Sequence, residues 1–184
     1  MIHDIFKVGI YEKELNIDNN FLKKYATTLS KNKDSKITNS NVGGFHSKYL
    51  DQKKFKDLSN SVVEHANIFS KALDYGKVKI TNMWCNVNGH KDFNQTHNHP
   101  ASKISGVYYV NTPESCGNIT FYSHSWFVLS QAELSRNNNN YTSVTWWKPS
   151  KEGMLYLFPS WLLHSVEPNN NKKQKRICYS FNLR

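Results

Sequence analysis

Two histidines separated by one residue lie in the segment QTHNHP, residues 95–100. Side chains two positions apart in an extended strand point to the same side, so His97 and His99 could bind one metal ion through two imidazoles. Pro100 favours the extended backbone at His99 that this geometry needs. An HxH pattern also arises by chance in a chain with eight histidines, so taken alone it also fits two polar side chains in a loop.

A third histidine, His164, lies in the segment LFPSWLLHSVEPN, directly after an alternating strand and a turn. In a fold of two packed sheets, the segments around His97 and His164 can meet, so that His97, His99 and His164 face one metal ion. Three protein ligands with open coordination positions are typical of a catalytic metal rather than a sealed structural one. The remaining histidines are interpreted as surface, loop or core groups: His3, His46, His65, His90 and His124.

The last strand-like segment, KRICYSFNL, has two chemically different faces. One face is apolar and is expected to pack in the core, with Ile177, Tyr179, Phe181 and Leu183. The other face carries Arg176 among small side chains. This is expected if the face lines a cavity for an acid, because guanidinium and carboxylate form a two-bonded fork. An exposed edge strand would explain the same arginine, so both interpretations stay open.

Two earlier segments add polar groups that could line the same pocket. In ISGVYYVN, Ser105 and Tyr109 share one face, which would offer a hydroxyl and a phenol. In TNMWCNV, Asn82 and Asn86 share a face. Asparagine is disfavoured in strands, so either a pocket contact or a structural hydrogen bond is indicated. The tryptophans are interpreted as core or pocket wall: Trp126, Trp146, Trp147 and Trp161.

The first half of the chain predicts helices that would support such a site. The segment NIDNNFLKKYATTLSKN has apolar residues at helical spacing behind a cap at Asp18 or Asn19. The segment DQKKFKDLSNSVVEHANIFSKALDYGK predicts a long amphipathic helix closed by Gly76. Between them, SNVGGFHS is interpreted as a loop. Later in the chain, SRNNNNYT is interpreted as a low-complexity loop.

From Val78 onward the hydrophobic period changes to two. Segments rich in β-branched and aromatic residues predict strands: VKITNMWCNVN, KISGVYYVN, GNITFYS, YTSVTWWKP, GMLYLFP and KRICYSFNLR. Helices followed by many short strands predict an α+β, mainly β fold: a sandwich or squashed barrel backed by N-terminal helices. We expect one domain over residues 1–184, with helical support over about 18–76 and the β core over about 78–184.

Composition excludes few functions, but it narrows the setting. The formal net charge of +10 comes mostly from lysines scattered beside asparagines, so we do not expect a nucleic-acid partner. Cys85, Cys116 and Cys178 lack CxxC spacing, which argues against a disulfide framework or a structural zinc site. The start of the chain has no long apolar run, so neither a signal peptide nor a membrane span is expected. A cytoplasmic location, in a bacterium or a phage-infected cell, follows by default.

These motifs, in this order, resemble the iron(II)- and 2-oxoglutarate-dependent oxygenases. The likeness is closest to the prolyl-hydroxylase-like branch and its small bacterial and phage relatives. The matching segments are SNVGGFHS, MWCNVNG, HNHPASKISGVYYVN, GNITFY, GMLYLFPSWLLHSVEP and KRICYSFN, which span most of residues 40–182. The fold that the resemblance implies is a double-stranded β-helix, which is a jelly-roll, cupin-like core.

The resemblance also implies roles for individual residues. His97 matches the first histidine of the family's HxD/E motif, and His164 matches its distal histidine. Arg176 matches the basic residue that pairs with the far carboxylate of 2-oxoglutarate, and Tyr109 matches a tyrosine that assists it. Asn86 matches a polar residue that helps to hold the cosubstrate.

His99 stands where the family usually has a carboxylate ligand, so the chain departs from the pattern there. Imidazole binds Fe(II) well, and we therefore expect His99 to be the third ligand. Three neutral imidazoles would leave the full positive charge of the iron uncompensated. In the alternative, His99 lies behind the ligands, and water or the carboxylate of Asp92 or Glu167 completes the site.

The activity implied is a dioxygenase that uses Fe(II), O2 and 2-oxoglutarate to hydroxylate a small-molecule or peptidyl substrate, with ascorbate as a helpful reductant in vitro. One alternative is a three-histidine, cupin-like dioxygenase that needs no 2-oxoglutarate. Another is a jelly-roll module that binds peptide, sugar or nucleic acid without turnover. The sequence leaves the substrate open, and it leaves the oligomeric state open, a homodimer included.

Overall fold

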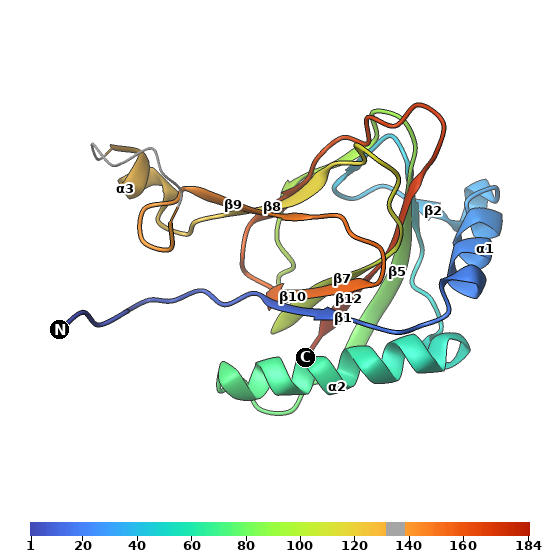
Figure 1. Ribbon diagram of the computed structural model, residues 1–184. Helices are drawn as coiled ribbons and strands as arrows, with labels where there is room; N and C mark the ends of the chain where they lie inside the picture. The colour runs from blue at the N-terminus through green and yellow to red at the C-terminus, as the bar shows by residue number, and fades with distance from the viewer. Residues whose placement is uncertain (132–138) are drawn as a thin grey trace.

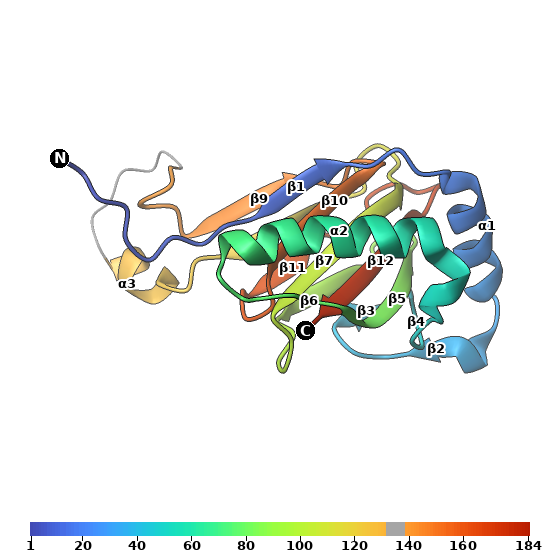
Figure 2. The same cartoon turned by 90° about the horizontal axis from the view of Figure 1, so that it is seen from below.

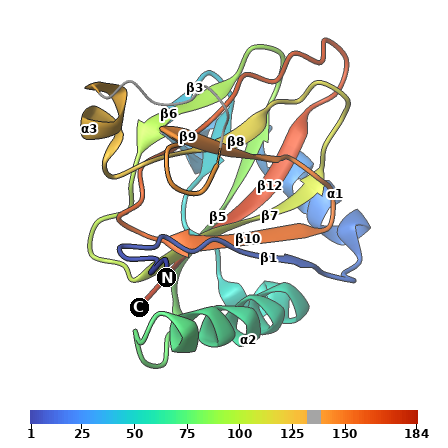
Figure 3. The same cartoon turned by 60° about the vertical axis from the view of Figure 1, so that its left-hand side comes forward.

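Two antiparallel β-sheets face each other in the computed structural model, which describes residues 1–131 and 139–184 (Figures 1 and 3). The seven-stranded sheet runs in the order β1 (Tyr11–Glu14), β10 (Met154–Pro159), β7 (Ile104–Asn111), β12 (Arg176–Leu183), β5 (Ile80–Asn88), β4 (Phe45–Ser47) and β2 (Lys36–Ile37). The five-stranded sheet runs β3 (Asn41–Val42), β6 (Phe93–His97), β11 (His164–Val166), β8 (Asn118–Tyr122) and β9 (Thr145–Pro149). The six segments with a period of two all form strands, which confirms the predicted mainly β fold.

Two helices cover the face of the seven-stranded sheet that points away from the second sheet (Figure 2). Helix α1 (Asn19–Leu29) begins after Asp18, whose side chain accepts a hydrogen bond from the backbone N–H of Asn20, as the sequence predicted. Helix α2 (Lys56–Ala72) follows the short 3-10 helix η2 (Gln52–Phe55) and buries one apolar stripe. The stripe consists of Leu58, Val62, Ala66 and Phe69. The main core therefore lies between helices and sheet.

The end of α2 differs from the prediction that Gly76 closes it. The helix ends at Ala72, and Asp74 adopts the left-handed conformation with φ of 55°. The N–H of Tyr75 donates to the carbonyl of Ser70 at 3.0 Å, which is the bond of a Schellman cap. Asp74 thus takes the position expected for glycine, and Gly76 lies in the turn beyond.

The SNVGGFHS segment is more ordered than the predicted loop, because β3 and β4 flank its two glycines. Strand β3 belongs to the five-stranded sheet and β4 to the seven-stranded sheet, so the glycines carry the chain from one sheet to the other. Gly43 has φ of 71°, and a Cβ there would lie 2.0 Å from a carboxylate oxygen of Asp92. Only glycine can occupy that position without a rearrangement.

The interpretation of the tryptophans as core or pocket wall is wrong for the three whose side chains the structure describes. Trp146, Trp147 and Trp161 are 40%, 55% and 46% exposed, and the first two lie on the edge strand of the five-stranded sheet. The side chain of Trp126, in helix α3 (Trp126–Gln131), lies outside the described residues. The predicted SRNNNNYT loop lies partly there too, while Tyr141 and Thr142 donate backbone N–H groups to the side chain of Asn139.

A further short helix, the 3-10 helix η1 (Lys33–Ser35), leads from α1 into β2. Across the described part of the chain, none of the helices combines the length and apolarity that crossing a membrane requires.

Candidate metal centre and cosubstrate cavity

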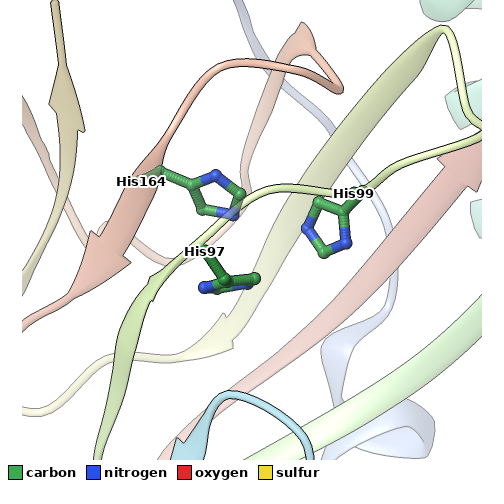
Figure 4. A group of neighbouring side chains, drawn as sticks. All are labelled: His97, His99 and His164. Atoms are coloured by element: carbon green, nitrogen blue, oxygen red, sulfur yellow. The ribbon is translucent and has the colours of Figure 1, made fainter.

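The three predicted histidines lie together between the two sheets (Figure 4). His97 is the last residue of β6 and pairs in register with His164, the first residue of β11. Ring centroids are 4.3 Å apart for His97 and His164, 5.0 Å for His97 and His99, and 5.1 Å for His99 and His164. One ring nitrogen from each residue lies within 4.8 Å of the others, a spacing that suits shared binding of one metal ion.

Backbone contacts orient these rings. Nδ1 of His97 lies 2.7 Å from the carbonyl oxygen of Gln95, and Nδ1 of His164 lies 2.9 Å from that of Leu162. A carbonyl only accepts, so each Nδ1 carries the proton and each Nε2 keeps its lone pair for a metal. The backbone N–H of His99 donates to the carbonyl of Ser160 at 2.9 Å, which fixes the chain just beyond the strand.

Burial keeps the three imidazoles neutral. Desolvation is the main cause of the lowered pKa of His97, His99 and His164, and the pKa of His99 falls to about 3. Repulsion from His97 and His46 contributes to this lowering of the pKa of His99. The neutral ring is the form that binds a divalent metal, so the cluster needs no deprotonation at neutral pH.

No carboxylate stands in for the missing acidic ligand among the described residues that line the cavity. Asp92 accepts a hydrogen bond from the backbone N–H of Gly89 at 2.6 Å, and Glu167 accepts one from Asn118 at 2.9 Å. Neither acid lines the cavity or belongs to the group of side chains that could share a metal ion, so the structure gives no support to the alternative in which one of them completes the site. His99 remains the residue that lies beside the other two histidines.

One cavity of about 720 Å³ joins the histidine cluster to the polar face of β12. Arg176, Cys178, Ser180 and Asn182 all line it, whereas the alternate residues of β12 lie in the helix-covered core, as predicted. Asn82 and Asn86 of β5 line it too. Arg176 is only 1% exposed, so the interpretation as an exposed edge residue is wrong.

Three residues that line this cavity each have a buried polar atom without a hydrogen-bond partner among the described residues. Nη1 of Arg176 donates to the carbonyls of Cys116 and Glu167, whereas its Nη2 is buried and has no partner in the described part of the chain. The hydroxyl of Tyr109 and Oδ1 of Asn86 are also buried, and no described residue forms a hydrogen bond with either atom. Burial is the main cause of the raised pKa of Tyr109, so its hydroxyl stays protonated as a donor. Unpaired buried polar groups are costly. A carboxylate bound here would accept hydrogen bonds from the two donors, Arg176 Nη2 and the Tyr109 hydroxyl.

Ser105 is the one predicted site residue that does not reach the cavity. Its hydroxyl lies 2.8 Å from Ser160 Oγ and donates to Oδ1 of Asn182, also at 2.8 Å. Ser105 shares a strand face with Val107 and Tyr109, which line the cavity, but it lies nearer the start of β7 and is not among the lining residues. Because its hydroxyl is hydrogen-bonded to Ser160 and Asn182, we interpret Ser105 as a structural residue that helps to fix the end of β12.

His46 and Ser40 are among the cavity residues that were not recognised from the sequence. His46 is 4% exposed and stacks on Trp84 with centroids 5.4 Å apart and planes 9° from parallel. Ser40 Oγ lies 3.3 Å from Nε2 of His97 and accepts a hydrogen bond from Asn94. Both flank the glycine turn that crosses between the sheets, and no local spacing in the sequence signals that crossing.

Comparison with known proteins agrees with this geometry. The sequence profile of the family described as "Putative 2OG-Fe(II) oxygenase" matches residues 82–182. No curated protein sequence matches the chain. A prolyl-4-hydroxylase from Pseudomonas putida aligns with a TM-score of 0.64 and 13% identity, over 96% of this chain and 92% of that one.

Two further solved structures share the fold. A viral collagen prolyl hydroxylase from Paramecium Bursaria Chlorella virus-1, in complex with 2-oxoglutarate, aligns with a TM-score of 0.60 and 11% identity over 95% and 94% of the two chains. HygX from Streptomyces hygroscopicus, with nickel and 2-oxoglutarate bound, aligns with a TM-score of 0.60 and 7% identity over 96% and 83%. The likeness establishes a double-stranded β-helix, and the profile shows that this chain belongs to the Fe(II)- and 2-oxoglutarate-dependent oxygenase family.

Proposed function

We propose that His97, His99 and His164 bind the Fe(II) of this oxygenase. We propose further that Arg176 and Tyr109 bind the distal carboxylate of 2-oxoglutarate. The observation that carries the proposal is a pair of buried donors, Arg176 Nη2 and the Tyr109 hydroxyl, which have no hydrogen-bond partner among the described residues and belong to residues that line the same cavity as the three histidines. Bound Fe(II) would use O2 as the oxidant: one oxygen atom would enter the C–H bond of the substrate, and the other would enter succinate as 2-oxoglutarate loses CO2.

The chain's own contribution is orientation and the exclusion of water. Arg176 is held through Nη1 by two carbonyl oxygens, so its free Nη2 is fixed before the cosubstrate arrives. Val107, Ile119 and Phe158 line the same cavity and make part of its wall apolar. A dry wall strengthens the pairing between guanidinium and carboxylate. Asn86 would help as a donor, through its Nδ2–H group, which reaches Ser180 Oγ at 3.3 Å in the structure.

Succinate formation tests the metal part of the proposal. Purified protein with Fe(II), ascorbate, O2 and 2-oxoglutarate should release succinate, and His97→Ala or His164→Ala should reduce the release to background. His65→Ala is the matched control, because His65 contacts Tyr11 and is not among the residues that line the cavity. A control variant as inactive as the other two would contradict the assignment.

The alternatives give different results in the same assay. Oxygen consumption that does not depend on 2-oxoglutarate, and that survives Arg176→Ala, would indicate a cupin-like dioxygenase instead. Ligand binding that a chelator leaves intact would indicate a binding module without turnover.

The substrate of this oxygenase is proposed at the level of class, as a peptide or a small molecule. Since two of the structural relatives are prolyl hydroxylases, proline-containing peptides are the first probe. We expect a true substrate to raise succinate release above the rate seen with 2-oxoglutarate alone. A peptide panel that gives no increase would move the proposal to the small-molecule class.

A further inference from the structure

The cavity around the metal centre has an unusual charge balance. None of the described residues that line it is an aspartate or a glutamate, and its charged lining residues are Arg176 and Arg184. The rest of the polar wall consists mainly of amides and hydroxyls, such as those of Asn94, Gln95 and Ser180. The site therefore has donors and cations but no fixed negative charge of its own.

A bound metal makes this balance more positive. Fe(II) brings two positive charges and buried Arg176 a third, whereas imidazole ligands bring none. Arg184 is exposed, so solvent screens its charge and it is left out of this balance. The dianion 2-oxoglutarate compensates two of the three, so one positive charge remains in a buried site. A carboxylate in the place of His99 would compensate that last charge. Leaving a buried charge unpaired is costly, so the loaded site should attract a counter-ion.

We infer that this centre, once it holds its metal and 2-oxoglutarate, binds one further monoanion, and that His99 is the residue that determines this preference. The inference rests on the proposed metal and cosubstrate sites. The monoanion could be a small inorganic ion from solution or the carboxylate of a substrate. In both cases the chemistry recognised is a single negative charge beside the histidine cluster.

Two substitutions test the inference by adding the missing charge. His99→Asp places a carboxylate at the ligand position itself. Asn94→Asp places one on the cavity wall without replacing a histidine, since Asn94 contacts Ser40 and lines the cavity. Asn170→Asp makes the same chemical change at an exposed position that does not line the cavity, and it serves as the control.

The measurement uses the full chain loaded with Co(II), whose visible spectrum reports the ligands of the metal, with 2-oxoglutarate present. Azide is titrated at constant ionic strength. We expect azide to change the spectrum of the wild type and of Asn170→Asp with the same Kd. We expect its Kd to rise at least about tenfold in His99→Asp and in Asn94→Asp, because each adds a like charge to the lining of the same cavity. If His99→Asp fails to hold the metal, Asn94→Asp still decides the question.

Separate titrations distinguish the source of the anion. A spectral response to chloride supports an ion from solution, whereas a response to acetate alone supports a substrate carboxylate. Azide that binds with the same Kd to all four proteins, or that leaves the wild-type spectrum unchanged, overturns the inference while the proposed function stands. A wild type that binds Co(II) without dependence on His97 overturns both.

Discussion

The two faces of the seven-stranded sheet do different work, and strand β12 shows the difference residue by residue. Toward the helices it presents Ile177, Tyr179, Phe181 and Leu183, all of which belong to the main core. Toward the second sheet it presents Arg176, Cys178, Ser180 and Asn182, all of which line the cavity. One face buries apolar area and satisfies its polar groups, whereas the other keeps buried donors without partners.

This contrast teaches where the protein holds its stability and where it holds its function. On the helix face, the hydroxyl of Tyr179 donates to the carbonyl of Leu22. On the cavity face, Arg176 Nη2 and the Tyr109 hydroxyl form no hydrogen bond with any described residue. Unpaired polar groups cost stability in the empty protein, and that cost is recovered when a ligand binds. Substitutions on the two faces should therefore have separable effects.

The largest expected effect on stability is seen when two neighbouring residues of β12, one on each face, are compared. Phe181→Ala should lower the free energy of unfolding by about 3–5 kcal/mol, because it removes a fully buried ring from the main core. Ser180→Ala, one residue away on the cavity face, should change it by less than about 1 kcal/mol. Urea denaturation of both variants measures the difference. Equal losses would remove the distinction between the faces.

Arg176→Met is expected to weaken cosubstrate binding more than it lowers stability. The Kd for 2-oxoglutarate should rise by roughly tenfold to a hundredfold, which corresponds to the loss of about 1.5–3 kcal/mol from a charge-assisted hydrogen bond. Its free energy of unfolding should fall by less than that of Phe181→Ala. Calorimetric titration of the metal-loaded protein gives the Kd. The Kd of Arg176→Lys should lie between those of the wild type and Arg176→Met, because lysine keeps the charge but cannot form the two-bonded fork. An unchanged Kd would place the cosubstrate elsewhere.

A smaller effect is expected from pH on the helix face. Burial raises the pKa of the Cys85 thiol from 9.0 to about 12, so above pH 9 the unfolded chain loses this proton while the folded chain keeps it. Stability contributed by Cys85 is therefore present below pH 9 and is lost as the pH rises toward 12. The slope from one thiol is at most about 1.4 kcal/mol per pH unit.

Variants isolate that slope. Cys85→Ala should flatten the decline of stability with pH above 9, whereas Val87→Ala, on the same strand and in the same core, should lower stability without altering the slope. Identical slopes in the two variants would show that Cys85 does not titrate as its burial requires.

Local patterns in the sequence were enough to predict the two faces of β12, the cap at Asp18 and the strands after Val78. These features depend on residues near one another in the chain, where periodicity and capping chemistry act directly. Local periodicity alone could not predict the clustering of His97, His99 and His164. The alternation of side chains along a strand placed His97 and His99 on one side, and the order of motifs along the chain linked them to His164.

The features that sequence reasoning missed depend on contacts between distant segments. His46 and Ser40 reach the cavity because the glycine turn crosses between sheets, and that crossing is fixed by packing against Asp92. Trp146 and Trp147 are exposed because β9 has a neighbour on one side only. Neither the crossing nor the position of a strand at a sheet edge is encoded in a local period.

The most direct test of this account is an anaerobic crystal structure with Fe(II) and 2-oxoglutarate bound. We expect the metal to be bonded to one nitrogen each of His97, His99 and His164. We also expect the distal carboxylate of 2-oxoglutarate within hydrogen-bond distance of Arg176 Nη2 and the Tyr109 hydroxyl. A metal held without His99, or a cosubstrate whose carboxylate lies away from Arg176, would contradict the account.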